Sequence, residues 1–167
     1  MLNIRLQKDF ALFKKYIRDT YETDDATLLP DLADEKTFDE SFLNPREFTI
    51  LMCGPKNSPY EGGTFRFQVI IPNEYPMVPP KVICKTKIVH KNISENYVCV
   101  ETLQDGWSPS LGLKQLFMSI YAVMFTQNYH QTVKTITQED LEKHEQYTKK
   151  ATEATKIYAK KVDNVST

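Results

Sequence analysis

The sequence predicts an α+β fold, and the distribution of prolines is the first sign of it. Proline is absent before Pro30 and after Pro109, so helices are permitted at both ends and interrupted in the middle. In that middle, short apolar runs alternate with turn-rich stretches, which indicates an antiparallel meander. Helices and strands are therefore segregated along the chain, and we expect one domain over residues 1–167.

The first segment has the pattern of an amphipathic helix, because apolar residues recur at steps of three and four: Leu2, Leu6, Phe10, Phe13 and Ile17. An acidic, irregular connector is expected over about residues 22–40, with a short strand near Thr37–Phe42. Strands are predicted at Phe48–Cys53, Thr64–Ile71 and Lys81–Lys85, separated by stretches rich in glycine, proline and asparagine.

Residues 86–112 lack periodicity, and a long loop inside a domain is usually functional. Helical patterns return after Gly112 and again after Thr137. In the last helix we expect one packed side, made of Leu141, His144, Tyr147, Ala151, Ala154, Tyr158 and Val162.

The composition is ordinary, with 41% apolar and 26% charged residues and a formal net charge of −1. Such a charge argues against a protein that binds nucleic acid, and no apolar run is long enough to span a bilayer. The N-terminus mixes charged residues into its apolar pattern, unlike a signal peptide. We therefore expect neither a nucleic-acid nor a membrane partner, and a monomer.

Three cysteines without a CxxC pair argue against disulfides and against a zinc site: Cys53, Cys84 and Cys99. A reducing compartment, cytoplasm or nucleus, is expected, with no metal. Cys53 and Cys84 lie in strand patterns, where a free cysteine behaves as a small hydrophobe. Cys99 lies in the long loop and is therefore the best candidate nucleophile, although any single cysteine is more often structural.

The stretch from Gly54 to Trp107 resembles the ubiquitin-conjugating enzyme family. GPKNSPYEGGTFRFQVIIPNEYPMVPPKV resembles the first half of its core, and His90-Lys91-Asn92 resembles its His-Pro-Asn signature. Cys99 lies where the family has its thioester cysteine, and Trp107-Ser108-Pro109 resembles its Trp-Ser-Pro loop. The resemblance implies a four-stranded antiparallel meander with an N-terminal helix and C-terminal helices.

The resemblance also implies a transferase. An activating enzyme would deliver ubiquitin or a ubiquitin-like protein, which Cys99 would hold as a thioester and pass to a substrate lysine, usually with a ligase. Asn92 would stabilise the oxyanion or hold its loop, and His90 would fix the turn around Asn92 rather than act as a base. No cofactor is implied, since the activating enzyme consumes the ATP.

Docking residues are implied by position as well. Arg5 and Lys8 match basic helix residues that bind the activating enzyme, while the loops with Met77 and with Ser108-Pro109-Ser110 match the two that receive ligase domains.

The chain departs from the family pattern near the expected site. Lys91 replaces the signature proline, and Asn92 and Cys99 are one residue closer than usual. Ungapped counting places Gln131 where an acidic residue normally helps the incoming lysine, and an amide is a poorer base.

Three alternatives follow. The stretch YPMVPPKVICKTKIVHKN leans toward neddylation-type members, which carry a Rub-family modifier. A catalytically weak or inactive variant could serve as a binding subunit, although such variants typically lack the cysteine. A cysteine hydrolase using Cys99 and His90 fits least, because nothing else resembles a protease.

Overall fold

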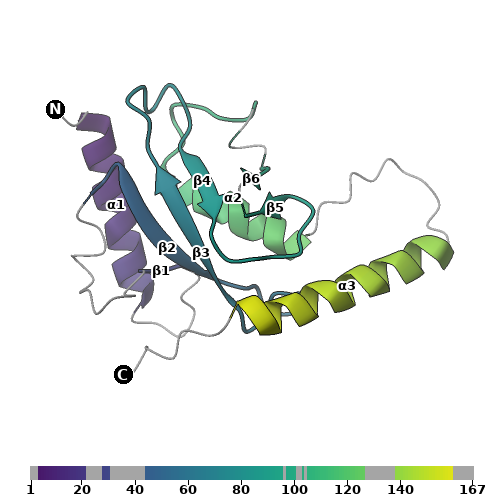
Figure 1. The fold of residues 1–167 in the computed structure, drawn as a ribbon. Helices are drawn as coiled ribbons and strands as arrows, with labels where there is room; N and C mark the ends of the chain where they lie inside the picture. The colour runs from purple at the N-terminus through teal and green to yellow at the C-terminus, as the bar shows by residue number, and fades with distance from the viewer. Residues whose placement is uncertain are drawn as a thin grey trace.

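The computed structural model describes residues 4–21, 28–30, 44–95, 97–100, 103, 105–126 and 138–159 of the chain. Figure 1 shows a central antiparallel sheet with helices arranged around it. The elements follow in the order α1 (Ile4–Tyr21), β1 (Leu28–Pro30), β2 (Glu47–Cys53), β3 (Thr64–Ile70), β4 (Lys81–Cys84), β5 (Ile93–Ser94), β6 (Tyr97–Val98), α2 (Leu113–Thr126) and α3 (Gln138–Tyr158). This α+β arrangement confirms the predicted fold class.

The main sheet is a four-stranded meander in the order β1-β2-β3-β4, with every neighbouring pair antiparallel. Its strands β2, β3 and β4 coincide with the predicted ones to within a residue at each end. The first strand differs: β1 lies inside the predicted connector and pairs Leu28 with Met52 of β2. The predicted strand at Thr37–Phe42 lies outside the described residues.

The core forms between α1, α2 and the inner face of the sheet. The predicted stripe of α1 is buried at Leu6, Phe10, Phe13 and Ile17, whereas Leu2 lies outside the described residues. The Phe13 ring stacks on Phe117 of α2, with centroids 5.2 Å apart, and lies 6.0 Å from the Phe48 ring of β2. These aromatic contacts fix α1 against both the sheet and α2.

The last helix packs differently from the expectation. Its buried residues are Ala151, Ala154 and Thr155, whereas Leu141 and Tyr158 are 48% and 46% exposed. The side chains described between Gln138 and Gln146 are all exposed, because this half of α3 extends away from the sheet (Figure 1). The predicted packed side was therefore wrong for Leu141, His144 and Tyr158; Val162 lies outside the described residues.

The C-terminal half of α3 is docked at the start of β3. The Thr64 amide donates to the Ala159 carbonyl at 3.1 Å, and a Cβ on Gly63 would lie 2.6 Å from the Thr155 Cγ2 atom. Only glycine therefore fits beneath the helix without a shift. The helix also lies against the segment that follows β4, where Lys87 Nζ is 4.7 Å from the centre of the Tyr158 ring.

Candidate functional site

The turn His90-Lys91-Asn92 is held by hydrogen bonds to its backbone and ring atoms. The Asn92 amide donates to His90 Nδ1 at 2.9 Å, and His90 Nε2 lies 3.2 Å from the Val123 carbonyl of α2. A carbonyl only accepts, so Nε2 carries the proton and Nδ1 is the acceptor. His90 is thus a neutral imidazole with both nitrogens engaged in holding the turn.

Burial supports this protonation state. It lowers the pKa of His90 from 6.5 to about 4, against an opposing contribution from the hydrogen bond to the Val123 carbonyl. A base is most effective when its pKa lies near the working pH. The geometry therefore supports the interpretation that His90 is structural.

Cys99 follows a small hairpin that the sequence reasoning missed. Strands β5 and β6 pair Ile93 with Val98, and the Cys99 amide donates to the Asn92 carbonyl at 2.6 Å. Val98 and Val100 are buried on either side, while Cys99 is half-buried. The hairpin thus brings Cys99 against Asn92 and leaves its side chain partly accessible.

The other two cysteines lie in the main sheet. Cys84 is fully buried, and burial raises the pKa of its thiol to about 12, although a bond to the Thr86 carbonyl acts in the opposite direction. Such a thiol stays protonated and inert. Cys53 is half-buried at the end of β2. Of the three, only Cys99 adjoins the turn.

Asn92 has an unusual side chain. Its Oδ1 atom is buried and has no hydrogen-bond partner among the residues that the structure describes. A buried carbonyl oxygen without a partner is costly, which makes this position stand out. Asn92 therefore combines a backbone carbonyl that accepts from the Cys99 amide with a buried side-chain oxygen that lacks a partner among the described residues.

Two tyrosines that the sequence analysis did not assign to the site support the same turn. The hydroxyls of Tyr60 and Tyr147 lie 2.9 and 3.3 Å from the Val89 carbonyl, directly before His90. Tyr147 is 58 residues further along the chain, on α3. No local sequence signal could reveal a contact at that separation.

A second cluster connects α1 with the two loops predicted to receive a ligase. The Trp107 indole N–H donates to the Pro76 carbonyl at 2.8 Å, and the Tyr75 and Trp107 rings lie 6.0 Å apart. The Tyr75 hydroxyl donates to Asp9 of α1 at 2.7 Å. Trp107 thus ties its own loop to the loop that carries Met77.

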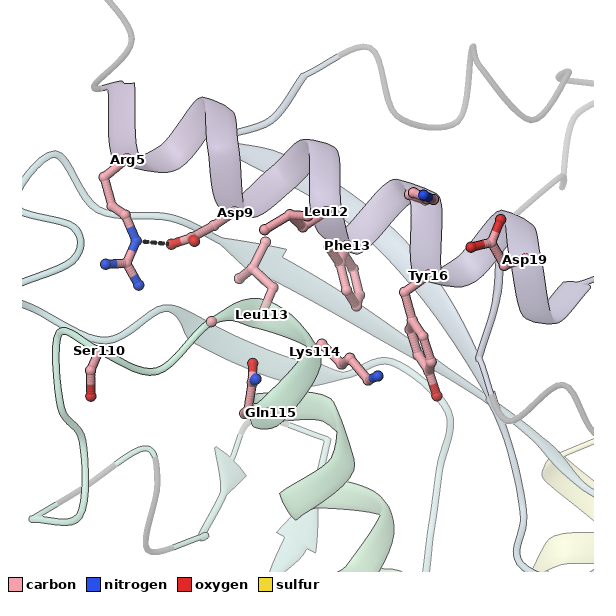
Figure 2. Close-up of a pocket in the computed structure, with 12 residues that line it drawn as sticks. Arg5, Asp9, Leu12, Phe13, Tyr16, Asp19, Ser110, Leu113, Lys114 and Gln115 are labelled. Carbon is pink, nitrogen blue, oxygen red and sulfur yellow. Dashed lines mark hydrogen bonds and ion pairs between the residues drawn. The ribbon is translucent and has the colours of Figure 1, made fainter.

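Asp9 also binds Arg5, one turn earlier on α1. The Arg5 Nε atom lies 2.6 Å from the Asp9 carboxylate, and Arg5 Nη2 lies 3.4 Å from the Leu111 carbonyl. Figure 2 shows this pair at one end of a groove between α1 and the start of α2, with Ser110 and Gln115 on the opposite side. Arg5 is therefore held on this face by its contacts with Asp9 and Leu111, and its predicted docking role stays a prediction.

The remaining predicted docking residues lie at the surface. Lys8, Pro109 and Ser110 are exposed, and Met77 is 72% exposed. The Ser108 and Ser110 hydroxyls are 2.9 Å apart, which shapes the exposed loop. The docking roles stay predictions, and Gln131 lies outside the described residues.

Within the described part of the chain, no three histidine, cysteine or acidic side chains gather in a way that could hold a metal. Nor does any of the described helices combine the length and apolarity needed to cross a bilayer.

Comparisons with known proteins point to one family. The family model described as "Ubiquitin-conjugating enzyme" matches residues 7–155. "Ubiquitin-conjugating enzyme E2 13" of Saccharomyces cerevisiae is 41% identical over 120 residues, which cover 71% of this chain and 78% of that protein. "Ubiquitin-conjugating enzyme E2 N" of Macaca fascicularis is 43% identical over 91 residues, 54% of this chain, and the match spans only 59% of the relative's length.

Two solved structures resemble the whole fold. The E2 domain of a Toxoplasma gondii ubiquitin-conjugating enzyme has a TM-score of 0.67 at 26% identity, covering 93% of this chain and 98% of that one. A structure described as a ubiquitin-conjugating enzyme from Plasmodium yoelii has a TM-score of 0.65 at 30% identity and covers 94% of both chains.

Proposed function

Because the chain belongs to the ubiquitin-conjugating enzyme family, we propose that it is a transferase that carries ubiquitin as a thioester on Cys99. The main support for choosing Cys99 is the 2.6 Å hydrogen bond from its backbone amide to the Asn92 carbonyl. It brings the backbone of Cys99, whose side chain is partly accessible, against that of Asn92, whose side-chain Oδ1 has no hydrogen-bond partner among the described residues. No other cysteine of the chain has this setting.

The proposed chemistry has two acyl transfers. The Cys99 thiolate attacks the carbonyl carbon of a modifier bound to the activating enzyme; a new C–S bond forms, and the activating enzyme's thiolate leaves. A lysine amine then attacks the Cys99 thioester, so that a C–N bond forms, the Cys99 thiolate leaves and the amine loses a proton to solvent or a base. The carrier is thereby regenerated without a cofactor, and ATP is consumed by the activating enzyme.

Both steps pass through a tetrahedral oxyanion that a positioned N–H donor stabilises. Asn92 is the proposed donor, through its side-chain amide. His90 has no proton-transfer role in this scheme, because its two nitrogens are occupied and its pKa lies well below neutral. The lysine proton must therefore pass to another group.

Ubiquitin is the proposed cargo, since the named relatives are all ubiquitin-conjugating enzymes. A Rub-family modifier remains the alternative that the sequence around Pro79 indicates. The proposed partners are an activating enzyme, which would contact Arg5 and the exposed Lys8, and a ligase, which would contact Met77 and the loop at Ser108–Ser110.

A charging assay tests the proposal. The chain is incubated with activating enzyme, ATP and either modifier, and the products are separated on a non-reducing gel. We expect an adduct of one modifier that thiols reverse, that Cys99→Ala abolishes and that Cys53→Ala retains. Cys99→Ser should give an adduct that resists thiols, because an oxyester forms instead.

Other outcomes assign other functions. An adduct that Cys53→Ala abolishes would move the carrier role to Cys53. If no modifier is bound by any matched activating enzyme, the transferase proposal is wrong and a non-catalytic binding subunit is the better description.

A further inference from the structure

The Val89 carbonyl, directly before the His90-Lys91-Asn92 turn, accepts hydrogen bonds from two parts of the fold. The Tyr60 hydroxyl lies 2.9 Å from it and the Tyr147 hydroxyl 3.3 Å. The two hydroxyl oxygens are themselves 3.4 Å apart. Since a carbonyl oxygen has two lone pairs and only accepts, both hydroxyl protons can be directed at Val89.

Tyr147 makes a second contact with the turn. The Lys91 ammonium lies 5.5 Å from the centre of the Tyr147 ring, within the range of a cation–π interaction. The hydroxyl and the ring of one side chain thus contact the residues on both sides of His90. Lys91 lacks the ring that fixes φ in a proline at the same place, so the turn depends more on such contacts for its shape.

Tyr147 is also placed where α3 begins to pack. The side chains described before it on α3 are exposed, whereas Ala151 and Thr155, one and two turns later, are buried. The docked half of α3 is fixed to β3 through Gly63 and Thr64. The Tyr147 hydroxyl therefore projects from a firmly held helix, which is what a positioning group requires.

We propose that Tyr147 is a positioning residue for the thioester site, acting through the Val89 carbonyl on the turn that presents Asn92 to Cys99. This inference rests on the proposed function. The chain of contacts is short: Tyr147 and Tyr60 hold Val89, His90 holds the Asn92 amide, and the Asn92 carbonyl holds Cys99.

The test compares Tyr147→Phe, Tyr60→Phe and the double variant. Thioester is formed first, and its discharge to free lysine is measured over a range of lysine concentrations. We expect Tyr147→Phe to lower the maximal discharge rate about threefold, with the half-saturating lysine concentration unchanged. In the double variant Val89 loses both donors, so its rate should fall by more than the product of the two single effects.

Tyr158→Phe is the matched control, because Tyr158 is on the same helix but contacts Lys87 instead of the turn. It should discharge at the wild-type rate. Thermal midpoints of all variants separate positioning from packing: a merely structural Tyr147 would lower the midpoint without changing the maximal rate. Wild-type discharge in Tyr147→Phe, together with a double variant no worse than Tyr60→Phe, would overturn the proposal.

Backbone NMR signals report on the turn whether or not the protein carries a modifier. Tyr147→Phe should shift the backbone amide NMR signals of Lys91, Asn92 and Cys99, whereas Tyr158→Phe should not. If the wild type never charges, the proposed function has failed, and the NMR comparison still decides whether Tyr147 controls the turn. Unmoved signals would refute that control even in an active enzyme.

Discussion

Replacing His90 with asparagine should remove one part of the pH dependence of stability. The pKa of His90 falls from 6.5 in the unfolded chain to about 4 in the folded protein, chiefly through burial. Between these values the unfolded state binds a proton that the folded state does not, so the free energy of unfolding decreases as the pH falls. Since one pKa unit corresponds to about 1.4 kcal/mol, the full loss amounts to about 3.5 kcal/mol; it begins as the pH falls through 6.5 and levels off below about pH 4.

Urea titrations at several pH values between these limits would measure the effect. Asparagine places an amide oxygen near the position of Nδ1, so it can still accept from the Asn92 amide while carrying no titratable group. Carboxylates titrate in both proteins, so the difference between the two pH profiles isolates His90. His144→Gln is the control for removing an imidazole, because the His144 side chain is exposed on α3 and lies outside the turn. Parallel profiles for the wild type and His90→Asn would refute the assignment of a buried, neutral His90.

Three further predictions follow from the packing and the surface. Phe13→Ala should lower the free energy of unfolding by about 3–5 kcal/mol, measured in urea, because Phe13 is 1% exposed and stacked on Phe117. Gly63→Ala should lower the free energy of unfolding by about 1–3 kcal/mol, because its Cβ would lie 2.6 Å from Thr155 Cγ2. Adding Thr155→Ser, which removes that methyl group, should restore part of the lost stability. If it restores none, this clash is not the cause. Lys8→Ala should slow charging by the activating enzyme at an unchanged thermal midpoint. Arg5→Ala should slow charging and also lower the thermal midpoint, because Arg5 binds Asp9.

The sheet was largely predictable, because its central strands are specified by their own residues. Alternation in Thr64–Ile71 predicts a strand with one buried face, and β3 has Phe65, Phe67 and Val69 buried as that pattern requires. The short strand β1 was not predictable in the same way. Its three residues are strand only because they pair with β2, and the surrounding acidic sequence favours a connector.

At the two ends of the last helix, the sequence predicts packing that the structure does not have. Periodicity correctly predicts a helix, but it cannot tell where along the helix the rest of the fold ends. Leu141 and Tyr158 have the spacing of a packed stripe and yet are exposed, because the contact with the sheet is limited to the turns around Ala151 and Thr155. Hydrophobic spacing gives the direction of a buried face and not its length.

The candidate site also has a part that could be predicted from the sequence and a part that could not. Cys99 could be chosen from its position in an unpatterned loop, and burial of Cys84 agrees with that choice. What holds Cys99 could not be foreseen, because the β5–β6 hairpin has strands of only two residues and its geometry depends on contacts from elsewhere. The oxyanion role of Asn92 and the ligase-docking roles of Met77 and of Ser108–Ser110 stay predictions, whereas the Lys8 and Arg5 variants test docking of the activating enzyme.

The turn before Cys99 shows why distant contacts matter most where chemistry is proposed. Its anchors come from the loop before β3 through Tyr60, from α2 through the Val123 carbonyl and from α3 through Tyr147. A turn held by three separate elements keeps its shape only while all three are packed, so its geometry depends on the global fold. Lys91 adds no backbone restraint of its own, and these anchors must supply it. Substitutions that loosen α3, far from Cys99 in sequence, should therefore affect the proposed transfer step before they unfold the sheet.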